Sequence, residues 1–179
     1  MKLLLHICCG PCAVYPVEVL QGENIEFEGF FFNPNIHPID EFLRRRDNAK
    51  ILSDLKNFPL TISDDYQESE WLSFPGTGEE RCKMCYSLRL GKVAAMAKEK
   101  GFDAFTTTLL VSPYQKHDLI KELGEKFGRI YGVGFYYRDF REGFRQGQQK
   151  AKEYGLYRQK YCGCIISRSE TKAKVKPNK

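Results

Sequence analysis

The chain has 179 residues, of which 42% are hydrophobic and 28% charged, and its formal net charge is +5. A chain of this length is typical of one domain with a substantial core. No apolar run approaches the ~20 residues that cross a membrane, and the apolar stretch that follows Met1 is too short for a secretory signal. We therefore expect a cytoplasmic protein that has no membrane partner.

Short apolar runs alternate with helical stretches along the chain. Strands are expected at residues 2–7, 25–32, 58–62, 102–108 and 129–135. Helices are expected at residues 11–20, from the loop at 33–38 to about 57, at 81–100, at 112–127 and at 139–154, with an irregular segment at 64–79. Strands that alternate with helices form parallel sheets covered on both faces. The sequence therefore predicts an α/β fold whose ligands bind beyond the carboxyl ends of the strands.

Capping residues and charge indicate the boundaries of these elements. Ser112 followed by Pro113 is typical of an N-cap and the first turn of a helix. Gly101 is typical of a helix C-terminus. One catalytic domain is expected at residues 1–166, followed at residues 167–179 by a basic tail that we expect to be flexible.

The seven cysteines lie in three tight groups. The groups are Cys8, Cys9 and Cys12, then Cys82 and Cys85, then Cys162 and Cys164. Grouped thiols that are far apart in sequence are typical of a metal or iron–sulfur site that folding assembles. The first group follows the first expected strand, where this architecture places its ligands. All seven thiols are therefore candidate metal ligands.

Two other functions fit part of this pattern. Residues 9–12 have the Cys-Gly-Pro-Cys sequence of a thiol oxidoreductase such as thioredoxin, in which a helix N-terminus stabilises one thiolate. The thioredoxin fold has a strand and a helix before the strand that bears this motif, whereas only seven residues precede Cys8. The second and third cysteine groups suit structural zinc in an RNA-binding module, but zinc there leaves the first group without a role.

Positive charge is concentrated between Arg138 and Lys160, where basic side chains exceed acidic ones by four. Tyrosines at positions 154, 157 and 161 are interleaved with these cations. Such a stretch suits a phosphate backbone with unstacked bases. Solvated helix faces explain the charge alone equally well.

Five short motifs in order carry a resemblance to a known family. They are His6-x-Cys8-Cys9-x-Pro11-Cys12, Phe32-Asn33-Pro34-Asn35-Ile36-His37-Pro38, Arg81-Cys82-x2-Cys85-Tyr86-x2-Arg89-Leu90, Thr107-Thr108-Leu109-x2-Ser112-Pro113-Tyr114 and Tyr157-Arg158-Gln159-x-Tyr161-Cys162-Gly163-Cys164. They resemble the epoxyqueuosine reductase QueH family from residue 6 to residue 164, essentially the whole chain. The match is specific because it places all seven cysteines.

The resemblance implies the last step of queuosine biosynthesis, the two-electron, two-proton reduction of epoxyqueuosine to queuosine. The partners it implies are a tRNA with epoxyqueuosine at the anticodon wobble position and an external low-potential electron donor. It implies a Rossmann-like, three-layer fold with a parallel sheet of about five strands, of the adenine-nucleotide alpha-hydrolase (HUP) kind. The cofactors it implies are a [4Fe-4S] cluster and a second, mononuclear iron beside it, without cobalamin.

Within this resemblance, particular residues take expected roles. Cys8 and Cys9 are expected in catalysis as well as in metal binding, and as a vicinal pair they are expected to address different metals. Tyr86 and Tyr161 are candidate proton donors, and Arg89 is expected to face the cluster from one turn beyond Cys85. His6 and Tyr114 are further candidate proton donors.

A carboxylate and several basic or aromatic residues complete the expected site. Asp64, or alternatively Asp65, is a candidate oxygen ligand of the second metal, because hard oxygen beside soft sulfur can leave an open position. Residues expected to contact tRNA phosphates are Arg141, Arg145, Arg158 and Lys160. Tyr66 and Trp71 are candidates for stacking on a base splayed out of the anticodon loop.

Overall fold

The computed structural model of the protein describes residues 1–175. Its strands are β1 (Lys2–His6), β2 (Glu26–Phe31), β3 (Leu60–Ile62), β4 (Ala104–Thr107) and β5 (Gly134–Phe135). They form one sheet in the order β3-β2-β1-β4-β5, and every neighbouring pair is parallel. The expected α/β fold with about five parallel strands is confirmed.

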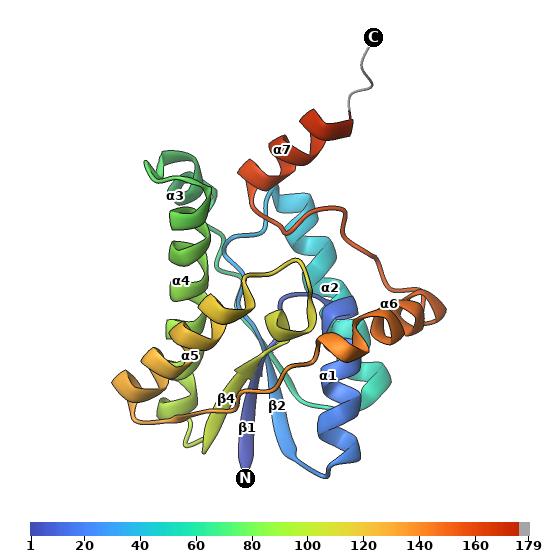
Figure 1. The fold of residues 1–179 in the computed structure, drawn as a ribbon. Coiled ribbons are helices and arrows are strands. Elements are labelled where there is room, and N and C mark those ends of the chain that lie inside the picture. Colours follow the sequence, from blue (N-terminus) through green and yellow to red (C-terminus); the bar gives the residue numbers. More distant parts are fainter. Residues whose placement is uncertain (176–179) are drawn as a thin grey trace.

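Helices cover both faces of this sheet (Figure 1). They are α1 (Gly10–Gly22), α2 (Ile39–Lys56), α3 (Glu68–Ser73), α4 (Gly78–Glu99), α5 (His117–Tyr131), α6 (Phe144–Glu153) and α7 (Ile165–Val175), with 3-10 turns η1 (Thr108–Val111) and η2 (Arg141–Gly143). Helices α1 and α2 lie on one face, and α4 and α5 lie on the other. None of the helices in the described chain is long and apolar enough to cross a membrane.

The side chains of β1 show why helices cover the sheet on both faces and give the fold three layers. Side chains alternate between the two faces of a strand. Leu3 and Leu5 pack into the core on the α1 and α2 side, and Leu4 packs into the core on the α4 side. All three are almost fully buried, as expected for a central parallel strand.

Strand order places a crevice at the carboxyl end of β1. The chain runs outward from β1 through β2 to β3, then crosses to β4 on the other side of β1. Ligands of such sheets bind at this point of reversal. Cys8 follows β1, Asn33 follows β2 and Thr108 follows β4, so segments distant in sequence meet there.

Two helix starts differ from the sequence-based expectation. Helix α4 begins at Gly78, because Thr77 and Glu80 form a capping box, so Cys82 lies beyond its first turn. Helix α5 begins at His117 and not at Ser112. The Ser112 carbonyl accepts a hydrogen bond from the Gln115 amide (N···O 3.3 Å) and closes a turn. Serine and proline in succession suit that turn as well as a helix start.

Other expected boundaries shift because of local packing. The expected irregular segment at residues 64–79 contains α3, whose Trp71 is fully buried. The expected strand at 129–135 is reduced to Gly134–Phe135 because α5 continues to Tyr131. The expected helix at 139–154 begins as η2 and becomes α6 at Phe144.

The expected basic tail overlaps a helix. Helix α7 spans Ile165–Val175 and contacts α3. The expected domain boundary at residue 166 therefore falls inside this helix. The flexibility expected of residues 167–179 stays a prediction, and residues 176–179 lie outside the described part of the chain.

Candidate active site

A cavity at the carboxyl ends of β1 and β4 gathers thiols from all three cysteine groups. The cysteines that line it are Cys8, Cys12, Cys82, Cys85, Cys162 and Cys164. The Sγ atom of Cys9 lies beside them, since those of Cys8, Cys9 and Cys12 are within 4.8 Å of one another. Three segments that are distant in sequence therefore build one thiol-lined cavity.

The first cysteine group is held by the N-terminus of α1 and by the start of η1. Cys9 is the N-cap of α1, and its Sγ accepts from the Cys12 amide at 3.4 Å. Thr108 Oγ1 donates to Cys8 Sγ at 3.2 Å and accepts from the Cys8 amide at 3.0 Å. Hydrogen bonds with the Cys12, Cys9 and Thr108 side chains hold the pKa of the Cys8 thiol well below its usual range. Cys8 is therefore the thiol of this group that loses its proton most readily.

The other two groups differ in how readily their thiols lose a proton. A hydrogen bond from the Cys164 thiol lowers the pKa of Cys162 to about 5. The same bond raises the pKa of Cys164, which acts as the donor. Burial raises the pKa values of Cys82 and Cys85. Each thiol near a positive charge or a metal would lose its proton more readily.

Arg89 supplies a buried positive charge to this cavity. Its side chain lines the cavity and the residue is only 4% exposed. Among the side chains described, up to residue 173, no carboxylate lies within ion-pairing distance of it. Burial opposes the charge, but the Cys85 and Cys8 sulfurs outweigh it and raise the pKa of Arg89. Arg89 thus lies among the thiols, and its expected role beside a cluster stays a prediction.

The two tyrosines expected to donate protons lie in different places. Tyr86 lines the cavity, where its hydroxyl donates to Gln115 Oε1 at 2.6 Å and accepts from the Lys116 amide at 3.3 Å. Burial raises the pKa of Tyr86 to about 12, so it keeps its proton at neutral pH. Tyr161 is outside the cavity lining, and its hydroxyl donates to the backbone carbonyl of His37.

Three other candidate residues are not part of the cavity lining. Both ring nitrogens of His6 are engaged, with Thr107 Oγ1 at 2.8 Å and the Phe32 carbonyl at 3.0 Å. Tyr114 is 84% exposed and lies in the turn between Ser112 and Gln115, which both line the cavity. Tyr66 packs edge-on against His37 and donates to Glu68.

Asp64 is not brought to the thiols. Its carboxylate forms an ion pair with Arg46 (O···N 2.9 Å), and its side chain is 68% exposed. It lies in the loop after β3, outside the cavity lining. Within the described residues the cavity lining contains no aspartate or glutamate. Its polar side chains carry thiol, amide, hydroxyl, guanidinium and indole groups.

The structure also reveals cavity residues for which the sequence indicated no role. Gln159 Nε2 donates to Cys9 Sγ at 3.1 Å and to Cys12 Sγ at 3.5 Å. Arg45, from α2, lines the cavity beside the third cysteine group. Both residues stand in or near recognisable sequence features, since Gln159 lies in a motif and Arg45 in a run of three arginines. Only the tertiary contacts distinguish them from surface residues.

The family of the chain is shown by comparison with known proteins. The family model described as epoxyqueuosine reductase QueH matches residues 3–170. The chain belongs to the QueH family. Similar proteins include the epoxyqueuosine reductase QueH of Dehalococcoides mccartyi, 35% identical over 170 residues, covering 94% of this chain and 93% of that protein. The epoxyqueuosine reductase QueH of Thermotoga maritima is 34% identical over 184 residues, covering 96% of this chain and 93% of that protein.

Solved structures similar to this QueH chain support its fold alone. A deacetylase–teicoplanin complex has a TM-score of 0.56 at 8% identity, covering 99% of this chain and 94% of that one. The zinc-inhibited form of teicoplanin deacetylase Orf2 has a TM-score of 0.53 at 9% identity, covering 75% of this chain and 66% of that one. The more specific adenine-nucleotide alpha-hydrolase assignment stays a prediction.

The residues of this QueH cavity fit a thiolate-bound metal centre. Soft sulfur ligands predominate, which suits iron–sulfur chemistry, and the unpaired Arg89 cation offsets the negative charge of thiolates. Buried polar atoms without a hydrogen-bond partner also belong to lining residues. They are Asn33 Oδ1, Asn35 Oδ1, Trp71 Nε1, Arg81 Nε and Gln159 Oε1. Buried polar atoms are normally paired, so this set indicates that the cavity accommodates a bound polar group.

Proposed function

We propose that this protein is an epoxyqueuosine reductase that converts epoxyqueuosine in tRNA to queuosine. The observation that carries the proposal is that a QueH-family chain brings cysteines from all three groups to one cavity beside Arg89. The reaction breaks the two C–O bonds of the epoxide and restores a carbon–carbon double bond. It consumes two electrons and two protons and releases one water molecule.

The cysteines are proposed to hold a [4Fe-4S] cluster and an adjacent iron. When bound, such a cluster supplies electrons one at a time at a potential set by its ligands and burial. Seven cysteines exceed the four that one cluster needs, which supports a second metal. The outward position of Asp64 leaves the thiols, together with substrate or solvent, to complete that metal's ligands.

The chain's own residues then have distinct proposed tasks. Arg89 stabilises thiolates in the cavity and repels competing cations. Tyr86 presents a protonated hydroxyl at the cavity wall, so we assign it the delivery of a proton to the departing oxygen. Tyr161 is proposed to position the third cysteine group, because its hydroxyl is bonded to the His37 carbonyl.

The surface around the cavity is proposed to bind the anticodon loop. Arg158 and Lys160 are exposed in the segment that leads to Cys162, and Arg145 is exposed on α6. Arg141 is also exposed but forms an ion pair with Asp139 (N···O 2.6 Å). Tyr114 offers an exposed aromatic face between two cavity-lining residues, on which an unpaired base can stack.

The proposal is tested by turnover under anaerobic conditions. The reconstituted protein receives tRNA that carries epoxyqueuosine and a chemical reductant, and the RNA is then digested to nucleosides and separated. Queuosine should appear as epoxyqueuosine disappears, and a Cys8→Ala/Cys82→Ala variant should form none. Absence of queuosine with fully loaded protein would overturn the proposed reaction. Stoichiometric zinc without labile sulfide in the purified protein would overturn the proposed cofactor.

A further inference from the structure

The segment that carries the third cysteine group, residues 157–164, has no regular secondary structure. We call it the C-terminal cysteine segment. A segment without backbone pairing to a sheet or helix must be held by other donors and acceptors. Its thiols nevertheless have to stand at fixed positions beside those of the other two groups. The contacts that hold it therefore matter for the site.

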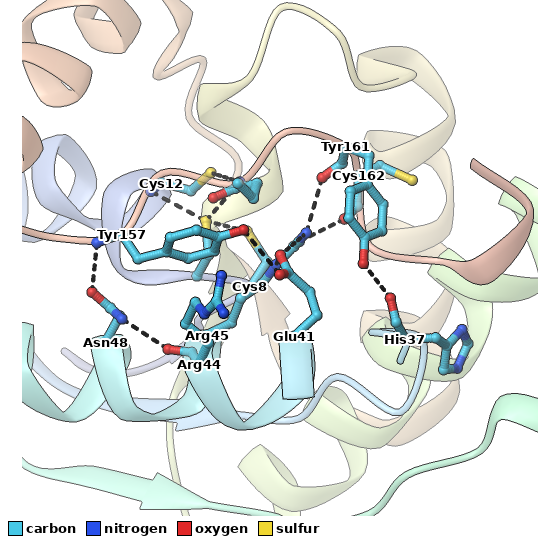
Figure 2. Close-up of polar contacts among 12 residues, drawn as sticks. Cys8, Cys12, His37, Glu41, Arg44, Arg45, Asn48, Tyr157, Tyr161 and Cys162 are labelled. Atoms are coloured by element: carbon cyan, nitrogen blue, oxygen red, sulfur yellow. Dashed lines mark hydrogen bonds and ion pairs between the residues drawn. The ribbon is translucent and has the colours of Figure 1, made fainter. Parts of the chain in front are cut away.

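Arg45 of α2 holds the end of this segment that bears the thiols (Figure 2). Its Nη1 donates to the Cys162 carbonyl at 2.9 Å, and its Nη2 donates to the Tyr161 carbonyl at 3.0 Å. The residue is only 2% exposed, and it also lines the cavity. One guanidinium group therefore donates hydrogen bonds to two successive backbone carbonyls beside the thiol-lined cavity.

Glu41 fixes Arg45 and also holds the start of the segment. Its Oε1 accepts from Arg45 Nε at 2.8 Å and lies 2.7 Å from Nη2. Its Oε2 accepts from the Tyr157 hydroxyl at 2.9 Å. The Tyr157 amide in turn donates to Asn48 Oδ1 at 2.7 Å. Both ends of the segment are thus attached to one face of α2, as Figure 2 shows.

The backbone of the segment is shaped to fit this contact. Gly163 has φ of +137°, a conformation that favours glycine, and a Cβ at this position would lie 3.2 Å from Arg45 Nη1. The Gly163 carbonyl accepts from the His37 amide at 2.8 Å. Three successive carbonyls, of residues 161 to 163, therefore each have a donor.

We propose that Glu41 and Arg45 form a positioning clamp that sets where the Cys162 and Cys164 thiols stand in the cavity. A buried ion pair adds little net stability compared with apolar residues of the same volume. The role of this pair is instead to fix geometry, because a planar guanidinium bonds two acceptors in a fixed arrangement that a lysine cannot reproduce. The consequence for metal loading rests on the proposed function, whereas the positioning itself does not.

The clamp predicts a local effect of the Arg45→Lys substitution in the full chain. Hydrogen–deuterium exchange with mass spectrometry should show faster exchange in peptides that cover residues 157–166. Loss of a charge-assisted hydrogen bond corresponds to a change of roughly 10-fold to 100-fold in protection. Peptides from β1 and β4 should keep their wild-type exchange. The amount of iron bound per chain after reconstitution should also be lower in Arg45→Lys than in the wild type.

Two further variants separate the clamp from a general effect on folding. Glu41→Gln keeps the volume of Glu41 and should also speed hydrogen–deuterium exchange in the peptides that cover residues 157–166, because Arg45 loses its charged partner. Arg46→Lys is the matched control, since Arg46 is the next residue of α2 and forms exposed pairs with Asp47 and Asp64. It should change neither exchange nor iron content.

The exchange data decide the proposal in either direction. Unchanged exchange at residues 157–166 in Arg45→Lys would overturn the clamp. Equally faster exchange in β1 and β4 would also overturn it, because that pattern reports only general destabilisation. If wild-type protein binds no iron and sulfide, the proposed function fails, while the exchange comparison still tests the clamp.

Discussion

Arg89 is the residue whose environment indicates most about what the cavity holds. A buried cation without a carboxylate partner is costly, and the side chains described provide none within ion-pairing distance. The groups that face it include the sulfurs of Cys85 and Cys8 and the ring of Tyr86. The arginine therefore destabilises an empty, fully protonated cavity and stabilises one filled with anionic ligands.

We predict opposite effects of Arg89→Met on the metal-free and metal-loaded protein. At acidic pH, where the facing thiols are protonated, removing the cation should raise the free energy of unfolding of the metal-free chain by about 1–3 kcal/mol. The same variant should lose iron faster to a chelator at neutral pH, because the thiolates lose their countercharge. Urea denaturation and iron release measure the two effects. Arg89→Lys serves as the charge-preserving control, and metal-free Arg89→Met that is less stable than wild type at acidic pH would contradict the interpretation.

Gly163 gives a second prediction at the residue scale. Gly163→Ala places a Cβ in a glycine-favoured backbone region and against Arg45, so it should destabilise the chain by about 1–3 kcal/mol and reduce iron binding. Gly155→Ala is the control, since Gly155 also has positive φ, of +68°, but nothing lies within 4 Å of its added Cβ. The control should lose stability without losing iron, and equal iron loss in both variants would argue against a specific fit at Gly163.

The regular elements follow from local pattern to different degrees. Strands β1 and β2 could be predicted from their apolar runs, and helices α1 and α4 from Pro11 near the start of α1 and Gly101 just after the end of α4. Helix α3 could not, since its acidic sequence gives no apolar periodicity and Trp71 alone anchors it. The predicted start of α5 at Ser112 was wrong, because Ser112 and Pro113 suit a turn as well as a helix N-terminus.

The turn before α5 provides a prediction about tRNA. If an unpaired base stacks on Tyr114, Tyr114→Ala should weaken tRNA binding by roughly 5-fold to 100-fold, the range for loss of one base–aromatic stack. Tyr114→Phe keeps the aromatic face and should bind like wild type. Affinities measured by filter binding test this. Equal affinity of the alanine and phenylalanine variants would exclude stacking at this position.

At the scale of the whole molecule, folding joins three cysteine groups that are far apart in sequence. This convergence could be predicted, because the first group follows the central strand and grouped thiols are typical of a shared site. The contributions of Arg45 and Gln159 could not, because the path of an irregular segment depends on tertiary contacts. The outward position of Asp64 shows the same limit, since its place after β3 does not determine which way the loop turns.

The distribution of positive charge predicts how tRNA binding depends on salt. Each phosphate contact to a single-stranded region contributes about 0.7 to the negative slope of log affinity against log salt concentration. An Arg158→Ala/Lys160→Ala variant should therefore reduce the slope by roughly 1 to 1.5. Arg129→Ala, at the far end of α5, should leave it unchanged. A wild-type slope near zero would be inconsistent with phosphate contacts at this surface.

The central claim is that the three cysteine groups jointly hold an iron–sulfur centre at the carboxyl end of β1. An anomalous-scattering map collected at the iron edge, from crystals of anaerobically reconstituted protein, tests it most directly. We predict iron density inside the cavity, within bonding distance of sulfurs from all three groups. Density confined to one group, density elsewhere on the surface, or a zinc edge without an iron edge would contradict the claim.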